Sequence, residues 1–411
     1  MKYTTKMLAE FTRTPGKEAY RRLEREMLEA VVTNRGAARV RAGHPWIYRS
    51  DIAGAAGEPG DIVRVVDRRG GFLGRAFYNP RSEISLRVAT RKDEPVDEAW
   101  FRTRMESALA YRESLRIDAD AYRLLHAEAD GVPGLVVDRY GDYLVLQVGA
   151  AAVERRLEWV TAALEDLRAP AGTLLRGDTA VRKREGLEAD VRVLSGDVPE
   201  SVVVREGPVR YRAELWSGQK TGGFLDQREN HIAAGRYARG RVLDVFSYAG
   251  GFALHAARNA DAVECVDASE PALGAARENA SLNGYENMTF TRSNAFDLLR
   301  ERSDAGERYE TVILDPPAFA KTKRDLSGAR RAYKEINLRA MKLLAPGGIL
   351  ITCSCSYHLS RELMEETLRA AASDAGATMR VREWRGQALD HPEILTVPET
   401  HYLKCVVLER V

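Results

Sequence analysis

Cysteines are scarce in this 411-residue sequence, and a long apolar segment is missing. The four cysteines do not follow the spacing of a disulfide framework, which indicates a reducing compartment. No apolar run approaches the roughly 20 residues that a membrane helix needs. The N-terminal segment also lacks the apolar core of a secretory signal. We therefore expect a soluble, cytoplasmic protein that does not act at a membrane.

Net charge is also small, at +2, so overall charge does not by itself indicate a nucleic-acid partner. The distribution of basic residues is more informative. One basic cluster lies within residues 13–49 and a second, KTKRDLSGARRAYK, spans residues 321–334. Each cluster alone is also typical of a solvated helix face, but the two together favour a polyanionic partner. The first cluster consists of Arg13, Lys17, Arg21, Arg22, Arg25, Arg35, Arg39, Arg41 and Arg49.

The chain is long enough for two or three domains, and its content of 30% charged and 45% hydrophobic residues is typical of globular proteins. Residues 35–92 contain strand-like runs separated by glycines, the first of them in ARVRAGHPWIYRSDI, and predict a small β-barrel or sandwich. Residues 96–215 mix a helical stretch with strand-like runs, which predicts an α+β domain without evident chemistry. From about Arg241, strands alternate with helices, which predicts an open parallel sheet with helices on both faces.

The central region places His126, Glu128 and Asp130 close together in the sequence. A metal site would need a second cluster of ligands, and the sequence does not offer one. We interpret these three residues as ordinary surface residues, and we expect no bound metal.

Two strand ends in the last region carry residues that suit a nucleoside ligand. The run LDVFSYAGGFALHAA places Asp244 near the end of one strand, followed by a turn with Gly250 and Gly251 that lets the backbone approach a ligand. The next strand ends at Asp267, whose carboxylate can accept hydrogen bonds from ribose hydroxyls. The G-x-G-x-x-G pattern of a dinucleotide site is absent. Together, the turn and the acid favour a nucleoside site over a purely structural turn.

These motifs resemble, in their order, those of the class I S-adenosylmethionine-dependent methyltransferases: D-x-F-x-x-x-G-x-F, the acid at Asp267, SNAFD and LDPPAF. The resemblance implies S-adenosylmethionine as cofactor, with Asp267 at the ribose and Asn294 and Ala295 near the adenine. The segment SGQKTGGFLDQREN resembles the one that precedes this domain in large-subunit ribosomal RNA methyltransferases, which implies that Asp226 also lies near the cofactor. The implied cofactor-binding residues are Phe224, Gln227, Arg228, Asp244, Ser247, Tyr248, Gly250, Asp267, Ala268, Asn294, Ala295 and Asp315.

A narrower resemblance, carried by QKTGGFLDQREN, DPPAFAKTK and TCSCS together, is to the 23S ribosomal RNA (cytosine-5) methyltransferases. This resemblance implies large-subunit ribosomal RNA as the partner, and the N-terminal β region resembles a PUA RNA-binding domain. The expected fold is multidomain: a small PUA-like β-barrel, a central α+β domain and a Rossmann-like α/β methyltransferase domain. The expected boundaries are an N-terminal extension at 1–34, the PUA-like domain at 35–95, the central domain at 96–215 and the methyltransferase domain at 216–411.

Two of the cysteines, Cys353 and Cys355, stand at the end of a predicted strand. Methylation of cytosine carbon 5 needs a thiolate that adds to carbon 6, and a thiol at the rim of a pocket supplies it. Both cysteines point to the same strand face, but Cys355 is nearer the carboxyl end. The resemblance also places the Thr-Cys-Ser nucleophile of RNA cytosine-5 methyltransferases at Cys355. We predict Cys355 as nucleophile, and Asp315 as the acid that binds the cytosine edge.

Other interpretations remain open at this stage. Ala318 stands where many RNA cytosine-5 methyltransferases carry a second cysteine, so the base that removes the carbon 5 proton is not identified. The loop DPPAF also resembles that of amino methylases, which keeps a guanine or adenine N-methyltransferase as an alternative. A non-catalytic RNA-binding assembly factor is the alternative from another class. The target nucleotide and the oligomeric state are open, with a homodimer among the arrangements to test.

Overall fold

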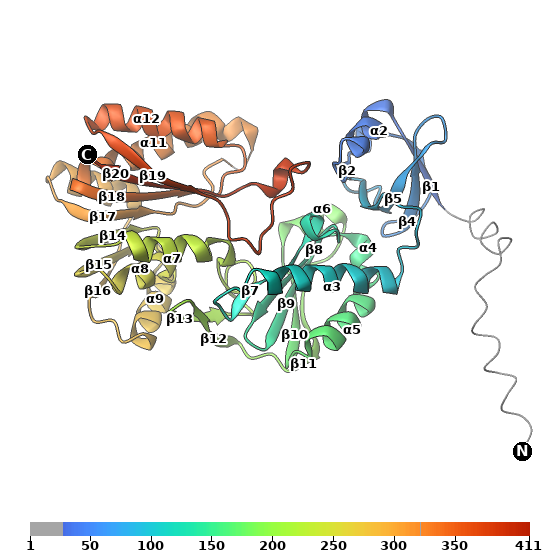
Figure 1. Cartoon of the computed structure of the whole chain (residues 1–411), viewed down its shortest axis with the longest axis horizontal. Coiled ribbons are helices and arrows are strands. Elements are labelled where there is room, and N and C mark those ends of the chain that lie inside the picture. Colours follow the sequence, from blue (N-terminus) through green and yellow to red (C-terminus); the bar gives the residue numbers. More distant parts are fainter. Residues whose placement is uncertain (1–27, 321) are drawn as a thin grey trace, which may run out of the picture.

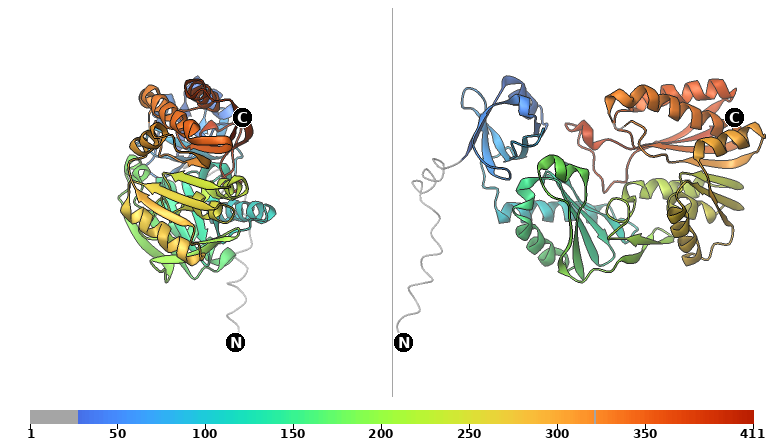
Figure 2. Two further views of the ribbon diagram at one scale, coloured as in Figure 1. Left: turned by 90° about the vertical axis from the view of Figure 1, so that its left-hand side faces the viewer. Right: turned by 180° about the vertical axis from the view of Figure 1, so that it is seen from behind.

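The computed structural model of the chain describes residues 28–320 and 322–411. Most of the segment 1–34, the first five residues of the basic cluster within 13–49, and Lys321 lie outside the described residues. The described chain forms an N-terminal β domain, a central α+β domain and a C-terminal α/β domain (Figure 1). The central domain lies between the other two (Figure 2). None of the described helices is both long and apolar enough to cross a membrane.

The N-terminal domain is a six-stranded sheet in the order β2-β6-β5-β4-β1-β3, with Ile47, Val65 and Leu86 in its core. The sheet begins at Glu29, ahead of the boundary expected at residue 35. Its elements are β1 (Glu29–Val32), α2 (Asn34–Arg41), β2 (Trp46–Ile47), η1 (Arg49–Asp51), β3 (Ile52–Ala55), β4 (Ile62–Val66), β5 (Phe72–Tyr78) and β6 (Leu86–Thr90).

Helix α2 corrects the sequence analysis, which expected a strand over its second half. The Thr33 side chain accepts a hydrogen bond from the Gly36 amide at 3.2 Å and so caps the helix. Ala37 and Val40 then bury one face of α2 on the sheet, while the arginines stay on the other face. The three-residue spacing of Ala37 and Val40 is that of one helix face, whereas a strand face needs apolar residues at every second position.

The central domain has the predicted α+β composition. Its five-stranded sheet runs in the order β11-β10-β9-β8-β7, and α3 and α5 pack together against it over a core that includes Phe101, Leu146 and Val160. Its elements are α3 (Glu98–Ser114), β7 (Ala121–His126), η2 (Ala127–Asp130), β8 (Leu135–Tyr140), β9 (Tyr143–Val148), α4 (Ala151–Glu154), α5 (Leu157–Arg168), β10 (Gly172–Gly177), α6 (Ala180–Glu185) and β11 (Asp190–Gly196). A separate hairpin, β12 (Ser201–Glu206) and β13 (Val209–Glu214), follows and contacts α9 (Glu270–Leu282) of the next domain.

The C-terminal domain is a seven-stranded sheet in the order β16-β15-β14-β17-β18-β20-β19. The strands are β14 (Arg241–Val245), β15 (Ala262–Asp267), β16 (Met288–Arg292), β17 (Tyr309–Leu314), β18 (Leu344–Ser354), β19 (Met379–Arg385) and β20 (Lys404–Arg410). The pairs among β14 to β18 are parallel, as predicted, but β20 runs antiparallel to both of its neighbours. The sheet is therefore mixed. After β19 the chain turns back, and β20 inserts between β18 and β19 in the opposite direction.

Helices cover both faces of this sheet, which confirms that part of the prediction. Tyr333 and Leu368 belong to the core on one face, and Phe252 and Leu273 to the core on the other. The helices are η3 (Leu225–Gln227), α7 (Arg228–Tyr237), α8 (Gly251–Ala257), α9 (Glu270–Leu282), α10 (Ala295–Asp304), η4 (Lys323–Asp325), α11 (Leu326–Leu343), α12 (Arg361–Ala375) and η5 (Pro398–Thr400). The strand order reverses between β14 and β17, the point at which open α/β sheets bind ligands.

Candidate active site

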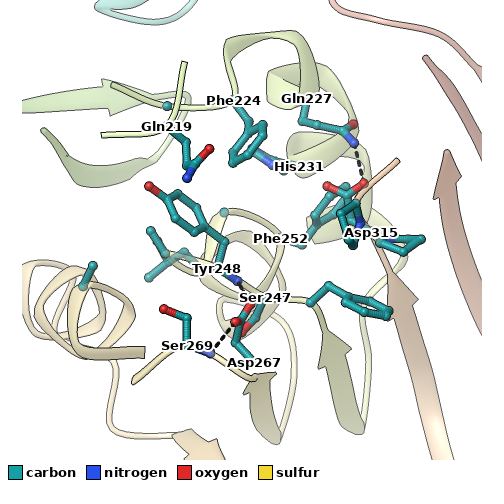
Figure 3. Close-up of a pocket in the computed structure, with 18 of the residues that line it drawn as sticks. Gln219, Phe224, Gln227, His231, Ser247, Tyr248, Phe252, Asp267, Ser269 and Asp315 are labelled. Atoms are coloured by element: carbon teal, nitrogen blue, oxygen red, sulfur yellow. Dashed lines mark hydrogen bonds between the residues drawn. The ribbon is translucent and has the colours of Figure 1, made fainter. Parts of the chain in front are cut away.

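A cavity of about 800 Å³ lies at the carboxyl ends of the parallel strands of the C-terminal domain. The turn after β14, the segment 217–227 ahead of α7 and the hairpin β12–β13 contribute its walls (Figure 3). The polar side chains that the sequence placed at separate strand ends therefore meet in one space. Of the predicted site residues, those that line the cavity are Phe224, Asp226, Gln227, Ser247, Tyr248, Asp267, Ala268, Asn294, Ala295, Asp315 and Cys355.

The Asp267 carboxylate is held at the end of β15 by two backbone amides. Oδ2 accepts a hydrogen bond from the Tyr248 amide at 3.0 Å, and Oδ1 accepts one from the Ser269 amide at 2.9 Å (Figure 3). Each oxygen keeps a lone pair for a further donor. The adjoining turn holds Phe246 and Tyr248 at φ values of 66° and 47°, a strained conformation that clusters at ligand sites.

Lys220 and Asp226 form an ion pair in the cavity wall. The Lys220 ammonium lies 2.7 Å from both oxygens of Asp226, and the Tyr402 hydroxyl donates to Oδ2 at 2.8 Å. Burial alone would raise the pKa of Asp226, but the Lys220 charge and these hydrogen bonds outweigh it and hold the pKa far below its usual value. Asp226 therefore stays ionised at neutral pH, and its ion pair with Lys220 lies beside the cavity.

Asp315 lies at the end of β17, on the cavity wall beside Pro316 and Pro317. Its Oδ1 accepts a hydrogen bond from Gln227 Nε2 at 2.9 Å (Figure 3). Burial raises the pKa of Asp315 to about 6, and the hydrogen bond from Gln227 opposes this rise. The carboxyl group therefore changes charge just below neutral pH and can exchange a hydrogen bond with a ligand in either state.

The two cysteines at the end of β18 have different surroundings. Cys353 is fully buried and belongs to the hydrophobic core together with Cys405, whereas Cys355 is half-buried and lines the cavity. Burial, followed by the charge of Asp315, raises the pKa of the Cys355 thiol to about 11. The structure therefore puts only Cys355 of this pair in contact with the cavity, as a thiol that needs a nearby positive charge to ionise.

Two family profiles match the chain. The profile of the PUA-like domain matches residues 30–91, and that of the S-adenosylmethionine-dependent methyltransferases matches residues 135–383. The chain belongs to the S-adenosylmethionine-dependent methyltransferase family. This result confirms the predicted PUA-like domain and S-adenosylmethionine as the cofactor.

Curated methyltransferases cover almost the whole chain. The protein named ribosomal RNA large subunit methyltransferase I of Tolumonas auensis is 41% identical over 379 residues, which are 90% of this chain and 96% of that protein. The protein of the same name from Aeromonas salmonicida is 42% identical over 375 residues, 89% of this chain and 95% of that protein.

Solved structures of methyltransferases share the fold. One described as a SAM-dependent methyltransferase from Streptococcus mutans is 19% identical, with a TM-score of 0.79 over 93% of this chain and 100% of that chain. Another, solved in complex with SAH, has a TM-score of 0.81 at 19% identity and the same coverage. At this level of identity the likeness establishes the fold.

The cavity of this methyltransferase fits the cofactor on two observations. The Ser247 hydroxyl is buried in the cavity wall and has no hydrogen-bond partner within the described residues, so a polar group of a ligand can satisfy it. Asp267 offers carboxylate lone pairs that suit ribose hydroxyls, and Phe246 and Phe296 add apolar surface that suits a purine ring. We expect these residues to hold the adenosine part.

Three residues of the predicted cofactor set lie behind the cavity rather than on its surface: Asp244, Gly250 and Arg228. Burial raises the pKa of Asp244 well above its usual value, so it is a neutral group below the turn. Gly250 has a φ of 86° and shapes the start of α8. The Arg228 guanidinium binds both oxygens of the buried Asp390, at 2.8 and 3.0 Å, and so faces away from the cavity.

Charged groups that the sequence did not predict reach the cavity from the hairpin β12–β13 and from the neighbouring helices. Glu206, at the end of β12, accepts hydrogen bonds from His231 Nδ1 at 2.8 Å and His255 Nε2 at 3.1 Å, and all three line the cavity. Burial works against the ionised Glu206, but the two histidines lower its pKa to about 2. The region 96–215, expected to lack chemistry, thus supplies one cavity wall. No sequence signal indicates this, because the three residues meet only in the folded chain.

The interpretation of His126, Glu128 and Asp130 as ordinary surface residues is wrong. Glu128 accepts hydrogen bonds from two residues of the N-terminal domain, the Trp46 indole at 2.8 Å and the Arg87 guanidinium at 3.0 Å. Asp130 accepts the His126 amide at 2.6 Å and the Arg112 guanidinium at 2.6 Å, and the Arg123 guanidinium lies 3.0 Å from His126 Nδ1. Burial, and then the Arg123 charge, lowers the pKa of His126 well below its usual value. These groups form part of the contact between the central and C-terminal domains. Within residues 28–320 and 322–411, no His, Cys, Asp and Glu group is arranged to hold a metal.

Proposed function

We propose that this protein transfers a methyl group to carbon 5 of a cytosine in ribosomal RNA of the large subunit (23S), through a covalent bond between Cys355 and the base. The observation that carries this proposal is the pair of Cys355 and Asp315 on one wall of the cofactor cavity. The names of the relatives, all ribosomal RNA large subunit methyltransferases, support the substrate class.

The chemistry follows from the needs of the base. Bound S-adenosylmethionine supplies an electrophilic methyl group. Carbon 5 of cytosine becomes nucleophilic when the Cys355 sulfur forms a bond to carbon 6, which moves an electron pair of the ring toward carbon 5. After carbon 5 gains the methyl group, it loses its proton to a base, and the carbon–sulfur bond breaks to restore the ring. Each event needs a thiol in the cavity rather than in the core.

Asp315 is suited to orient the cytosine. Its carboxylate can accept a hydrogen bond from the amino group of the base, or pair with the protonated ring nitrogen and draw electron density from carbon 6. The two prolines after it fix the backbone of this loop, which keeps the acid in register with the base. Because the pKa of Asp315 is about 6, the accepting form dominates at neutral pH.

The PUA-like domain is the part that we expect to bind the RNA outside the cavity. Most arginines of the first basic cluster within the described chain are paired: Arg35 with Asp51, Arg41 with Asp67 and Arg49 with Glu83. Arg39 has no such carboxylate partner in that part of the chain and lies over the Tyr48 ring, 4.6 Å from its centre. A guanidinium on an aromatic ring offers both charge and stacking surface to RNA.

The test uses ribosomal RNA from a strain that lacks this gene, incubated with the purified protein and S-adenosylmethionine. Mass spectrometry of the nucleosides should show new 5-methylcytosine, and RNA that contains 5-fluorocytosine should trap the protein as a stable adduct, because fluorine blocks loss of the carbon 5 substituent. Formation of a methylated guanine or adenine amine instead, without any adduct, would support the N-methyltransferase. Cofactor binding without methylation of any nucleoside would favour the assembly factor.

A further inference from the structure

The connection between β19 and β20, residues 386–403 and here called the C-terminal strap, contacts both the cavity and the N-terminal domain (Figure 1). At the cavity, Tyr402 donates a hydrogen bond to Asp226 at 2.8 Å. At the far end, Thr396 Oγ1 donates to the Gly43 carbonyl of the N-terminal domain at 3.1 Å. The strap therefore bridges the space between the PUA-like domain and the candidate active site.

The tip of the strap is a fixed turn with an apolar side chain in solvent. The Val397 amide donates to the Ile394 carbonyl at 2.8 Å, and the Ile394 amide donates to Thr400 Oγ1 at 2.8 Å. Leu395, inside this turn, has a relative exposure of 102%, the highest among the exposed large hydrophobic residues of the described chain. Single exposed leucines are common, but this one is held at the end of a hydrogen-bonded projection.

Aromatic residues border the same region. Tyr357, two residues after Cys355, is 44% exposed. Partial burial, followed by the charges of Glu399 in the strap and Tyr48 in the PUA-like domain, raises the pKa of Tyr357. The Tyr48 ring carries the Arg39 guanidinium. Tyr48 and Arg39 of the PUA-like domain and Tyr357 near the candidate nucleophile thus add aromatic and charged surface at the two ends of the strap.

We infer that the tip of the C-terminal strap inserts Leu395 into a base stack of the RNA where the RNA passes between the PUA-like domain and the cavity; this rests on the proposed function. A base inside a stack cannot reach a thiol within a cavity, so the enzyme must open the stack. Apolar side chains that enter between bases do so in other nucleic-acid complexes. The hydrogen-bonded turn holds Leu395 in solvent, and the Tyr48 and Tyr357 rings can stack on displaced bases.

The experiment compares Leu395→Ser with a matched control, Val381→Ser, since Val381 on β19 is also exposed, at 52%. The substrate is large-subunit ribosomal RNA from a strain that lacks this gene. It is used either folded in the presence of magnesium ions or as short fragments produced by alkaline hydrolysis. Leu395→Ser should lower kcat/KM about tenfold or more on folded RNA and leave it near wild type on fragments, because only folded RNA has a stack to open. Val381→Ser should match wild type on both.

Two results overturn this inference. One is equal rates of Leu395→Ser and wild type on folded RNA, and the other is an equal loss on folded RNA and fragments, which would indicate a general defect. Failure of the wild type on both substrates is distinguishable from these, because it overturns the proposed function and the inference with it.

A separate observation concerns Lys404, the first residue of β20. Its ammonium donates hydrogen bonds to the carbonyl oxygens of Ser356 and Tyr402, both at 2.8 Å, and the residue is 3% exposed. Within the described chain it has no carboxylate partner. A lysine ammonium has three donors, so one remains, and a buried cation without a counter-ion is unfavourable. The carbonyl at Ser356 belongs to the residue directly after Cys355.

The charges around Cys355 come from every element that surrounds it. Asp315 on β17 and Asp226 in the segment 217–227 oppose its ionisation, and Lys220 favours it. Tyr333 on α11 also lies near, since the charge of Cys355 acts on its phenol. Burial lowers the pKa of Lys404 to about 8, and the charge of Cys355 acts in the opposite direction. The ammonium and the thiolate therefore each lessen the penalty of burying the other.

We propose that Lys404 is a positioning residue that stabilises the thiolate of Cys355 and holds the Ser356 carbonyl directly after the thiol. The Cys355 proton passes to solvent as the sulfur ionises, and the ammonium remains as the counter-charge. The contribution of Lys404 to catalysis rests on the proposed function. Its effect on the ionisation of Cys355 does not, because that ionisation can be measured without RNA.

The experiment measures alkylation of Cys355 by iodoacetamide against pH, with the modified peptide identified by mass spectrometry. Lys404→Met, of similar volume, should lower the alkylation rate at about pH 7, where Lys404 is charged, by about tenfold or more, and Lys404→Arg should keep the rate close to wild type. Superimposable pH profiles of wild type and Lys404→Met would overturn the proposal, as would an equal change in Lys404→Arg. A circular-dichroism melt checks that each variant is folded, and the result stands whether or not Cys355 proves to be the nucleophile.

Discussion

Gln227 Nε2 lies 2.9 Å from Asp315 Oδ1 and donates a hydrogen bond to it, which joins the segment ahead of α7 to the end of β17. Burial raises the pKa of Asp315 to about 6, and the Gln227 hydrogen bond opposes that change. Gln227 therefore helps to keep Asp315 ionised at neutral pH, the form that accepts a hydrogen bond from a cytosine amino group.

We expect the methylation rate to rise with pH through about 6 as Asp315 ionises. Gln227→Leu removes the donor, so the pKa of Asp315 should increase and the acid limb of the profile should move to higher pH. The measurement is kcat/KM against pH on large-subunit ribosomal RNA. Identical acid limbs in the two proteins would show that Asp315 ionisation does not control the rate.

Asp315 should also destabilise the fold above its pKa. Its pKa is raised on folding from about 3.8 to about 6, so the folded state holds the proton more tightly, and stability falls as pH rises through this range. Asp315→Asn should therefore raise the Tm at about pH 8, have little effect at about pH 4, and abolish methylation. Thermal melts at both pH values test this, and a lower Tm at the higher pH would contradict it.

Cys355→Ser should bind S-adenosylmethionine normally and lose methylation and the 5-fluorocytosine adduct, because an alkoxide forms far less readily than a thiolate. Cys353→Ala is the matched control, since Cys353 packs in the core and does not reach the cavity. It should stay active with a modest loss of stability. Calorimetry and gel detection of the adduct measure both outcomes. An adduct that survives in Cys355→Ser and is lost in Cys353→Ala would reverse the assignment.

Asp267→Ala should weaken S-adenosylmethionine binding by about 1.5–3 kcal/mol, the range for hydrogen bonds to a charged group. Part of this loss would come from the backbone, because the carboxylate also fixes the amides of Tyr248 and Ser269. Asp297→Ala, at an exposed position on α10, is the control and should bind normally. Titration calorimetry gives the affinity of each variant for S-adenosylmethionine. Equal affinities of Asp267→Ala and wild type would show that Asp267 does not bind the cofactor.

Asp390→Ala should be strongly destabilising, by about 3–5 kcal/mol, because it leaves the buried Arg228 guanidinium without its counter-ion. Asp390 also accepts the Arg123 amide at 2.7 Å, so the change would loosen the contact between the central and C-terminal domains. Glu365→Ala breaks an exposed pair with Arg369 and should change stability by less than about 0.5 kcal/mol. Urea unfolding monitored by tryptophan fluorescence compares the two variants; similar midpoints would show that the buried pair is dispensable.

The sequence by itself determined the fold class of the C-terminal domain and the edge at which its ligands bind. Asp267 and Asp315 each follow a short apolar strand, and alternating strands and helices imply a parallel sheet. Since the carboxyl ends of parallel strands meet at one edge, both acids had to lie near the same cavity. These inferences need only local patterns and the geometry of parallel sheets.

The tertiary structure alone separated Cys353 from Cys355, because strand alternation assigns both to one face and only the end of the sheet exposes one to the cavity. It also decided the partners of the buried charges. Arg228 pairs with Asp390, 162 residues away, and Glu206 pairs with His231 and His255 on two different helices. An isolated charge in a sequence predicts an exposed position, whereas burial with a partner depends on which distant residue the fold brings within hydrogen-bond distance.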